Sequence, residues 1–226
     1  MNGKPYNLLY LQLLFTLVII FSGCSVEEDI ISATYPEYVF TSVTIGTQIW
    51  MVENLKTTML NDSASIPLVE SSSVWGSLDT PGYCWYNNDE KSNKDVYGAL
   101  YNNYAIMTSK LCPVGWHVPS KTEWNILTDY LGGLNIAGGK LKEMGLGHWD
   151  FPNTGASNES GFTALPGGYR NFEGNYSGIH ESSQWWTSTE DGSFRAWQLN
   201  LHTNYNSAGK ECLNNRNGFS VRCVKD

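Results

Sequence analysis

The hydrophobic residues of this chain form one long run at its start and short periodic patterns further on. Leu8 to Phe21 is largely apolar, and Lys4 is the single charged residue before residue 27. A positive start followed by roughly 7–15 apolar residues is typical of a secretory signal peptide. The run is short for a membrane span, which needs about 20 residues. The pattern therefore predicts an exported protein whose folded part begins after this segment.

Alternation of apolar and polar residues predicts strands in the folded part. Val43 and Ile45 alternate with polar residues. Gly46-Thr47 then favours a turn before residues 48–52 return, so residues 40–55 are expected to form a hairpin. The same alternation predicts further strands at residues 184–188, 197–201 and 219–223.

A capped helix is the clearest helical prediction. Ser120-Lys121-Thr122-Glu123 has the spacing of a capping box, in which Ser120 caps the amide of Glu123 and the Glu123 carboxylate reaches back. Gly132-Gly133 is expected to end this helix. Its apolar face carries Trp124, Leu127 and Leu131.

Two weaker periodic segments and one irregular region complete the pattern. Residues 97–107 and residues 136–144 have a helical period, so we expect helices there. Residues 145–183 are rich in Gly, Asn, Ser and Thr, with scattered aromatic residues, and predict a long irregular loop region. Unstructured segments of this length inside a folded domain are usually functional.

Composition and charge narrow the class of partner. The chain is 41% hydrophobic and 16% charged, which predicts a folded domain. Acidic residues outnumber basic ones, 22 to 14, for a net charge of -8. Nucleic-acid binding needs basic side chains that release counterions from phosphate, so we expect no nucleic-acid partner. The same charge disfavours adsorption to anionic lipid.

The end of the apolar run, Phe21-Ser22-Gly23-Cys24, resembles a lipobox, the cleavage site of bacterial lipoproteins. The resemblance implies a signal peptide over residues 1–23, an acylated Cys24, and a tether over residues 24–40. The acidic residues 25–29 resemble the tag that sends Bacteroidetes lipoproteins to the cell surface. An incidental cysteine after a plain signal peptide, and acids that serve only as linker, are the alternatives. We expect an outer-membrane protein that contacts the membrane through its N-terminal lipid only.

Four cysteines remain beyond Cys24: Cys84, Cys112, Cys212 and Cys223. An even number of cysteines outside the cytoplasm predicts two disulfides, with three possible connectivities. Buried free thiols are the alternative. The spacing of the cysteines and of the four histidines does not indicate zinc, and we expect no metal and no cofactor.

Six phrases of the sequence resemble a known family in their order and spacing. They lie at residues 45–55, 97–102, 112–120, 161–170, 185–189 and 218–224. The family is the Fibrobacter succinogenes major paralogous domain, and the resemblance covers about residues 41–226, taken here as one domain. That family is similar in turn to the C-type lectin-like fold, whose superfamily also holds formylglycine-generating, sulfatase-modifying enzymes.

The resemblance implies a fold and a disulfide. It implies an α+β domain with two main helices, a small twisted antiparallel sheet and a long irregular loop region. In the lectin-like fold the last strand runs beside the first, which implies a bond between Cys112 and Cys223. Cys84 and Cys212 would then pair with each other, and a Cys212–Cys223 link across a terminal hairpin is the alternative.

A binding function fits this picture best. Sugar-binding relatives of the lectin-like fold hold calcium through Glu-Pro-Asn and Trp-Asn-Asp motifs, and neither motif occurs here. No nucleophile elbow is present, and we expect no catalytic residues. We therefore expect a non-catalytic surface module for a glycan or a protein partner, with Trp149, Tyr176 and Asp191 as ligand contacts. A structural adhesin or appendage subunit, and an enzyme of the formylglycine-generating type, are the alternatives.

Overall fold

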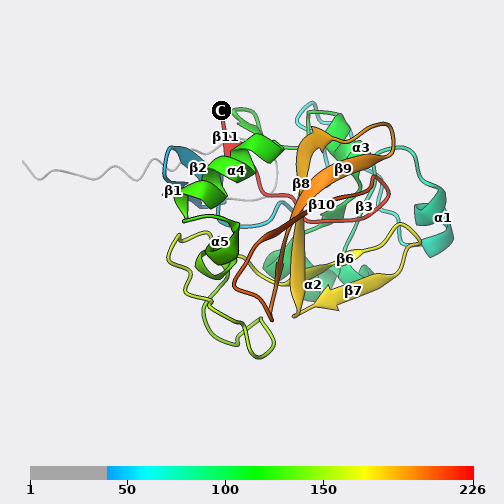
Figure 1. The fold of residues 1–226 in the computed structure, drawn as a ribbon. Coiled ribbons are helices and arrows are strands. Elements are labelled where there is room, and N and C mark those ends of the chain that lie inside the picture. The colour runs from blue at the N-terminus through cyan, green and yellow to red at the C-terminus, as the bar shows by residue number, and fades with distance from the viewer. Residues whose placement is uncertain (1–39) are drawn as a thin grey trace, which may run out of the picture. The chain divides into compact units, whose positions relative to one another are not determined.

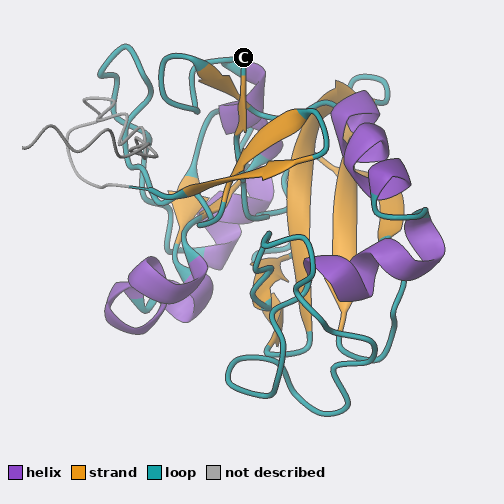
Figure 2. Ribbon diagram, turned by 90° about the vertical axis from the view of Figure 1, so that its left-hand side faces the viewer, coloured by secondary structure: helices purple, strands orange, loops and turns teal. Residues whose placement is uncertain are grey.

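Residues 40–226 are described by the computed structural model, and their strands form three β-sheets between short helices (Figure 1). The resulting domain is mixed α/β, as the sequence predicts. Figure 2 shows the strands of the largest sheet running nearly parallel to the vertical axis, with helices on both sides. The signal peptide, the lipidation at Cys24 and the tether fall on residues outside this range and stay predictions.

The hairpin predicted at residues 40–55 forms one edge of a four-stranded sheet. Its strands are β1 (Ser42–Ile45), β2 (Gln48–Met51), β11 (Val224–Lys225) and β5 (Trp116–His117), in the order β1-β2-β11-β5. Gly46 makes the turn with a φ of 63°, a region that glycine enters without steric cost. Val224 pairs with Trp50 in β2 and with His117 in β5. The C-terminal strand is thus inserted beside the first hairpin.

The largest sheet has five strands in the order β10-β9-β8-β6-β7. They are β6 (Gly167–Arg170), β7 (Tyr176–Ile179), β8 (Ser182–Glu190), β9 (Arg195–His202) and β10 (Gly209–Asn214). The β6–β8 pair is parallel and the other pairs are antiparallel, so this sheet departs at one pair from the small antiparallel sheet that the resemblance implied. Residues 145–183 are also not wholly irregular, since β6 and β7 lie within them. Glycine and serine in these strands hid them from the sequence pattern.

The helices are short. They are α1 (Ser72–Ser77), α2 (Glu90–Tyr97), α3 (Asn103–Met107), α4 (Lys121–Tyr130) and α5 (Leu134–Leu141), with a 3-10 turn at Tyr86–Asn88. The third sheet consists of the strands β3 (Tyr83–Cys84) and β4 (Leu100–Tyr101). In residues 40–226, none of the helices combines the length and the apolar character that crossing a bilayer requires.

The capping box of α4 is confirmed. The Glu123 amide donates to Ser120 Oγ at 3.2 Å, and the Ser120 amide donates to the Glu123 carboxylate at 2.7 Å. The helix predicted at residues 136–144 exists as α5, two residues earlier. The helix predicted at residues 97–107 is confirmed only for residues 103–107, as α3, because Gly98 has a φ of 75° and β4 separates α2 from α3. A Cβ at Gly98 would lie 2.8 Å from the Leu55 carbonyl oxygen, so only glycine fits this close approach.

Two tryptophans of β8 divide the core between the two faces of the large sheet. Trp185 packs 6.2 Å from Trp124 of α4, while Trp186 packs 4.5 Å from Phe219. Neighbouring strand residues point to opposite faces, and both rings are fully buried. The large sheet is therefore covered on both sides at this position. Trp124 also contacts Trp50, with ring centroids 4.6 Å apart, and so joins α4 to the first hairpin.

The disulfide between Cys112 and Cys223 is confirmed, with the two Cα atoms 6.1 Å apart. It links the segment before β5 to the residue before β11. The second predicted pair is wrong, because Cys84 and Cys212 are both free thiols. Cys84 is buried in β3, whereas Cys212 lies half-buried in β10 of a different sheet. The predicted pair assumed that every cysteine of an exported protein forms a disulfide. A buried cysteine such as Cys84 can remain a free thiol in the core.

Replacing Trp124 by alanine should destabilise the domain by about 3–5 kcal/mol, the usual cost of removing a large buried ring. Ser120→Ala should cost less, about 0.5–2 kcal/mol, because it removes one cap of the same helix. Chemical denaturation of both variants and the wild type measures the two values. A larger loss for Ser120→Ala would contradict the packing of Trp124 at the centre of the core.

Candidate functional site

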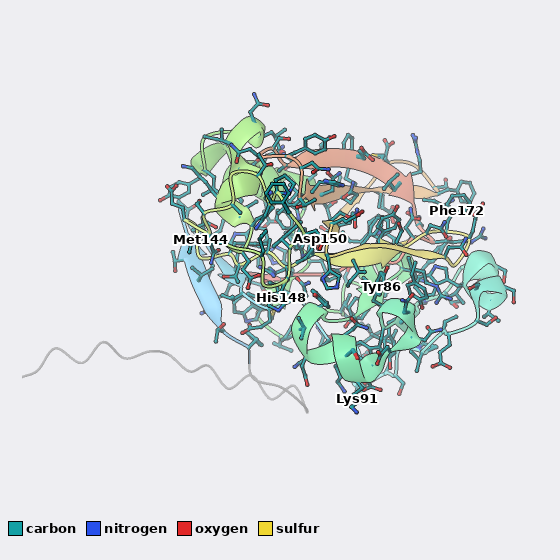
Figure 3. All side chains as sticks on the ribbon, turned by 90° about the horizontal axis from the view of Figure 1, so that it is seen from below. Tyr86, Lys91, Met144, His148, Asp150 and Phe172 are labelled. Atoms are coloured by element: carbon teal, nitrogen blue, oxygen red, sulfur yellow. A yellow bond between two sulfur atoms is a disulfide. The ribbon has the colours of Figure 1, made fainter. Side chains whose placement is uncertain are left out.

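The chain leaves α5 and forms a loop over residues 143–154, referred to as the 143–154 loop. Its base is closed by Asn153, whose Nδ2 donates to the carbonyls of Glu143 at 2.9 Å and Gly145 at 2.7 Å. Figure 3 shows Met144, His148 and Asp150 of this loop on the same face of the molecule as Tyr86 and Phe172. The loop thus presents these three side chains on one face, on a base fixed by hydrogen bonds.

The loop carries apolar side chains that the fold does not cover. Met144 is 70% exposed, Leu146 is 58% exposed and Phe151 is 82% exposed. Beside them Asp150 is exposed, and its carboxylate makes no ion pair within residues 40–226. Apolar groups gathered next to a free acceptor are a common feature of binding surfaces.

Trp149, predicted as a ligand contact, belongs to the core instead. Its side chain is 1% exposed, and its indole Nε1 donates to the Ala164 carbonyl at 2.9 Å. The prediction is wrong because the ring faces inward and anchors the loop. The neighbouring Phe151, two residues along, takes the exposed position that the sequence analysis gave to Trp149.

Two histidines flank Tyr97 beside the loop. The rings of His148 and His180 each lie 6.0 Å from the Tyr97 ring. His148 Nδ1 donates to the Glu143 carboxylate at 2.8 Å, and His180 Nδ1 donates to the His148 carbonyl at 2.9 Å. A carbonyl can only accept, so His180 carries a proton on Nδ1. Burial, together with the charges of Glu143 and Asp150, raises the pKa of Tyr97.

The backbone at this position is strained. His180 has a φ of 65°, which a residue other than glycine rarely adopts. The Asp150 amide donates to the His180 carbonyl at 2.8 Å, so the turn between β7 and β8 is tied to the 143–154 loop. Such conformations persist where the surroundings hold them, often at functional sites. In residues 40–226 no group of three or more His, Cys, Asp or Glu side chains is placed to hold a metal ion.

Tyr176, the second predicted contact, is half-buried in β7. Its hydroxyl donates to Asn88 Oδ1 at 2.6 Å, and its ring lies 5.4 Å from Tyr86 and 4.8 Å from the Arg170 guanidinium. Burial raises the pKa of Tyr176. The ring therefore packs against neighbouring side chains, and its hydroxyl is already used within the fold.

Asp191, the third predicted contact, lies far from the other two. It follows β8, whose nine residues at about 3.3 Å per residue separate it from the turn at His180. Figure 1 shows the two ends of β8 at opposite sides of the domain. Asp191 forms an ion pair with Arg195 at 2.9 Å. The expectation that Asp191 contacts the same ligand as Trp149 and Tyr176 is wrong, because the length of β8 places Asp191 away from the loop region.

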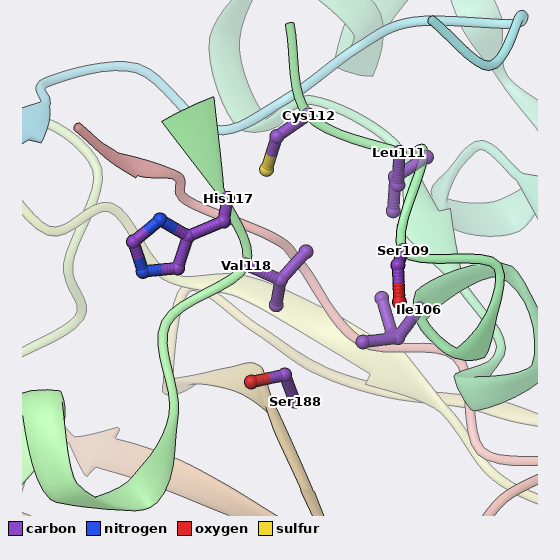
Figure 4. A pocket seen from close by; sticks show the side chains of 7 residues that line it. All are labelled: Ile106, Ser109, Leu111, Cys112, His117, Val118 and Ser188. Carbon is purple, nitrogen blue, oxygen red and sulfur yellow. The ribbon is translucent and has the colours of Figure 1, made fainter. Parts of the chain in front are cut away.

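A small cleft that the sequence analysis did not identify lies beside the disulfide (Figure 4). Its volume is about 170 Å³, and it is lined by Ile106, Ser109, Leu111, Cys112, His117, Val118 and Ser188. Six of these residues lie between Ile106 and Val118, on α3, on β5 and in the residues that join and follow them. Ser188 of β8 is distant in the chain, so the cleft forms only where β8 packs against that segment. The register of β8 shifts between Trp186 and Glu190, and Ser188 lies in that irregular stretch.

At the edge of this cleft both ring nitrogens of His117 form hydrogen bonds with carboxylates. His117 Nε2 lies 2.7 Å from Glu123 Oε1, and Nδ1 lies 2.6 Å from Asp226 Oδ1. Only a protonated imidazole donates from both nitrogens. Partial burial opposes the charge, but the hydrogen bonds to Asp226 and Glu123 raise the pKa of His117. His117 is thus a fixed link, and it has no free nitrogen to act as a general base.

This link makes stability depend on pH in one direction. The pKa of His117 is higher in the folded chain than in the unfolded chain, where it is about 6.5. The contribution of His117 to the free energy of unfolding is therefore complete below pH 6.5, and it is lost as the pH rises through the pKa of the folded chain. The free energy of unfolding, measured between pH 5 and 9, should fall over that range. His117→Gln should be less stable at low pH and should lack this part of the decline; an unchanged profile in the variant would contradict the link.

Comparison with known proteins gives a family but no individual relative. A profile of the Fibrobacter succinogenes major domain matches residues 43–225, which is most of the chain. The chain finds no match among curated proteins or among solved structures. The matched range covers both large sheets, the disulfide and the 143–154 loop. The chain therefore belongs to the Fibrobacter succinogenes major domain family.

Proposed function

We propose that the domain is a non-catalytic binding module that holds a glycan on the 143–154 loop, and that an N-terminal lipid anchors it to the outer membrane at the cell surface. The exposed Phe151 ring next to the free Asp150 carboxylate is the observation that carries the glycan proposal. The C-type lectin-like fold, in which an equivalent loop region carries ligands, is part of the same proposal.

The loop offers both kinds of contact that a sugar uses. The C–H face of a pyranose packs on an exposed aromatic ring such as Phe151. Sugar hydroxyls donate to carboxylates, and Asp150, the residue before Phe151, is an exposed acceptor. His148 is half-exposed and is held by Glu143, so its orientation is set before a ligand arrives. Preorganised contacts reduce the entropy that binding costs.

A protein partner is the second candidate ligand. It is favoured by Met144 and Leu146, which are exposed apolar side chains on the same loop. Methionine side chains are flexible and adapt to irregular protein surfaces. The two candidates differ in what they need from the loop, since a sugar depends on the Phe151 ring and on Asp150, whereas a protein also covers Met144 and Leu146.

A role without cysteine-based catalysis is supported by the state of the four cysteines in residues 40–226. Cys112 and Cys223 are joined in a disulfide. Burial raises the pKa of the Cys84 thiol to about 11, which keeps it protonated, and the pKa of Cys212 is also raised to about 11. A reactive cysteine needs the opposite, a lowered pKa that favours the thiolate.

The glycan proposal is tested on an array of bacterial and host glycans with the soluble domain. Phe151→Ala and Asp150→Asn should each weaken binding to any glycan that the wild type retains, by about tenfold or more, which corresponds to one good contact of about 1.4 kcal/mol. Phe194→Ala is the matched control, because Phe194 is 73% exposed but lies in the turn between β8 and β9. Equal losses in all three variants, or no retained glycan, would reject the proposal.

The anchor is tested by replacing Cys24 with serine in the full chain. The variant should lose acylation and appear in the soluble fraction, while the wild type stays with the membrane, because several acyl chains on one residue anchor stably. Protease treatment of intact cells distinguishes an outward-facing domain from a periplasmic one. Mass spectrometry of the mature N-terminus that finds an unmodified Cys24 would refute the lipidation.

A further inference from the structure

Lys142, the residue just before the 143–154 loop, is fully buried. It follows α5 and its side chain is 0% exposed. Its ammonium donates to three main-chain carbonyls, those of Thr154 at 3.0 Å, His202 at 3.1 Å and Tyr205 at 2.9 Å. The number of N–H donors matches the number of acceptors, and the group lies 5.4 Å from the Trp149 ring.

The surroundings hold a cation without an acidic partner. Lys142 has no ion pair within residues 40–226, so its charge is balanced by the carbonyl dipoles and the Trp149 ring. Burial lowers the pKa of Lys142 to about 8, so at pH 7 the group still carries its proton and all three donors. A buried charge is tolerated only when its hydrogen bonds are complete. The three carbonyls therefore form a cage that fits an ammonium-type cation.

The cage joins the two ends of the loop to the turn beneath it. Lys142 precedes the first residue of the 143–154 loop, and the Thr154 carbonyl belongs to the last. The His202 carbonyl comes from the last residue of β9, and the Tyr205 carbonyl comes from the turn that follows it. The loop is also tied to this turn by the Thr154 amide, which donates to the Thr203 carbonyl at 2.7 Å. One ammonium thus closes the neck of the loop and fixes it to the sheet.

We propose that the three carbonyls form a site for an ammonium-type cation, that Lys142 fills it from within the chain, and that its occupancy positions the loop that carries the ligand surface. The last clause rests on the proposed function, whereas the first two concern the loop alone. Lys142 is a positioning residue, because it acts on Phe151 and Asp150 through the loop and is itself buried away from any ligand.

The test removes the ammonium from the chain and returns it in solution. In Lys142→Ala at pH 7, amide exchange of residues 143–154 should be faster than in the wild type by about tenfold or more, the effect of losing one hydrogen bond to a charged group. Ammonium chloride should restore much of the protection. Tetramethylammonium chloride at equal ionic strength should not, because it is larger and has no N–H donor.

Lys140→Met is the matched control. Lys140 lies two residues earlier, and its side chain reaches the surface, where it pairs with Glu159 at 3.2 Å. This variant should leave exchange of the loop unchanged. Equal rescue by the two salts, or unchanged exchange in Lys142→Ala, would overturn the proposal.

A second variant keeps the test decisive if Lys142→Ala does not fold. Lys142→Met fills the space without donors, so it should show fast loop exchange that neither salt slows, and normal exchange would overturn the proposal. Glycan binding by the same variants is measured separately. If Lys142→Ala loses amide protection in the loop but the wild type binds no glycan, the cage is supported and the proposed function is rejected.

Discussion

Main-chain carbonyls in irregular segments need donors, and this requirement shapes the whole domain. Buried carbonyls without partners cost free energy comparable to a lost hydrogen bond. In residues 40–226 three basic side chains are fully buried, Lys142, Arg170 and Arg222, and each donates to at least one main-chain carbonyl from a segment distant in the chain. Arg170 donates to Val69, Glu70 and Gly174, and Arg222 donates to Phe162. These cations allow long loops to pack on a sheet without regular secondary structure of their own.

The buried cations lie against the aromatic core. The Arg222 guanidinium is 4.0 Å from the Phe162 ring, and Arg170 is 4.5 Å from the Trp75 ring. Asn54 accepts from Arg222 and from the Trp185 indole, so one amide joins the cation to the core of the large sheet. Cation–π contacts become stronger when water is excluded. Most of the tryptophan rings of the chain are thus buried in the core, which leaves few aromatic rings exposed to a ligand.

The exposed side chains of the 143–154 loop are those that do not pack into the core. Trp149 is drawn into the core, while Phe151 remains outside on a loop that is held at both ends. The proposed ligand surface therefore combines side chains free to make contacts with a backbone that is already ordered. The cleft beside Cys112 lies elsewhere, and its histidine is bound by two carboxylates. The 143–154 loop thus combines exposed apolar side chains with an Asp150 carboxylate that is unpaired within residues 40–226.

By itself the sequence determined the local elements and the family. The hairpin at residues 40–55 and the capped helix at Ser120 depend on interactions between near neighbours, which a pattern of residues records. The Cys112–Cys223 bond followed from the order and spacing of family phrases rather than from local pattern. These features could be predicted because each depends on information that is close in the chain or repeated across a family.

Tertiary structure alone decided which residues face a ligand. Trp149 and Phe151 differ by two positions and look equally suitable in sequence, yet the Ala164 carbonyl captures one indole and leaves the other ring exposed. Asp191 lies away from the loop because the nine-residue strand β8 separates them. Lys142 positions the loop because it donates to carbonyls at residues 154, 202 and 205. Burial and long-range hydrogen bonds depend on segments distant in the chain, and no local pattern specifies them.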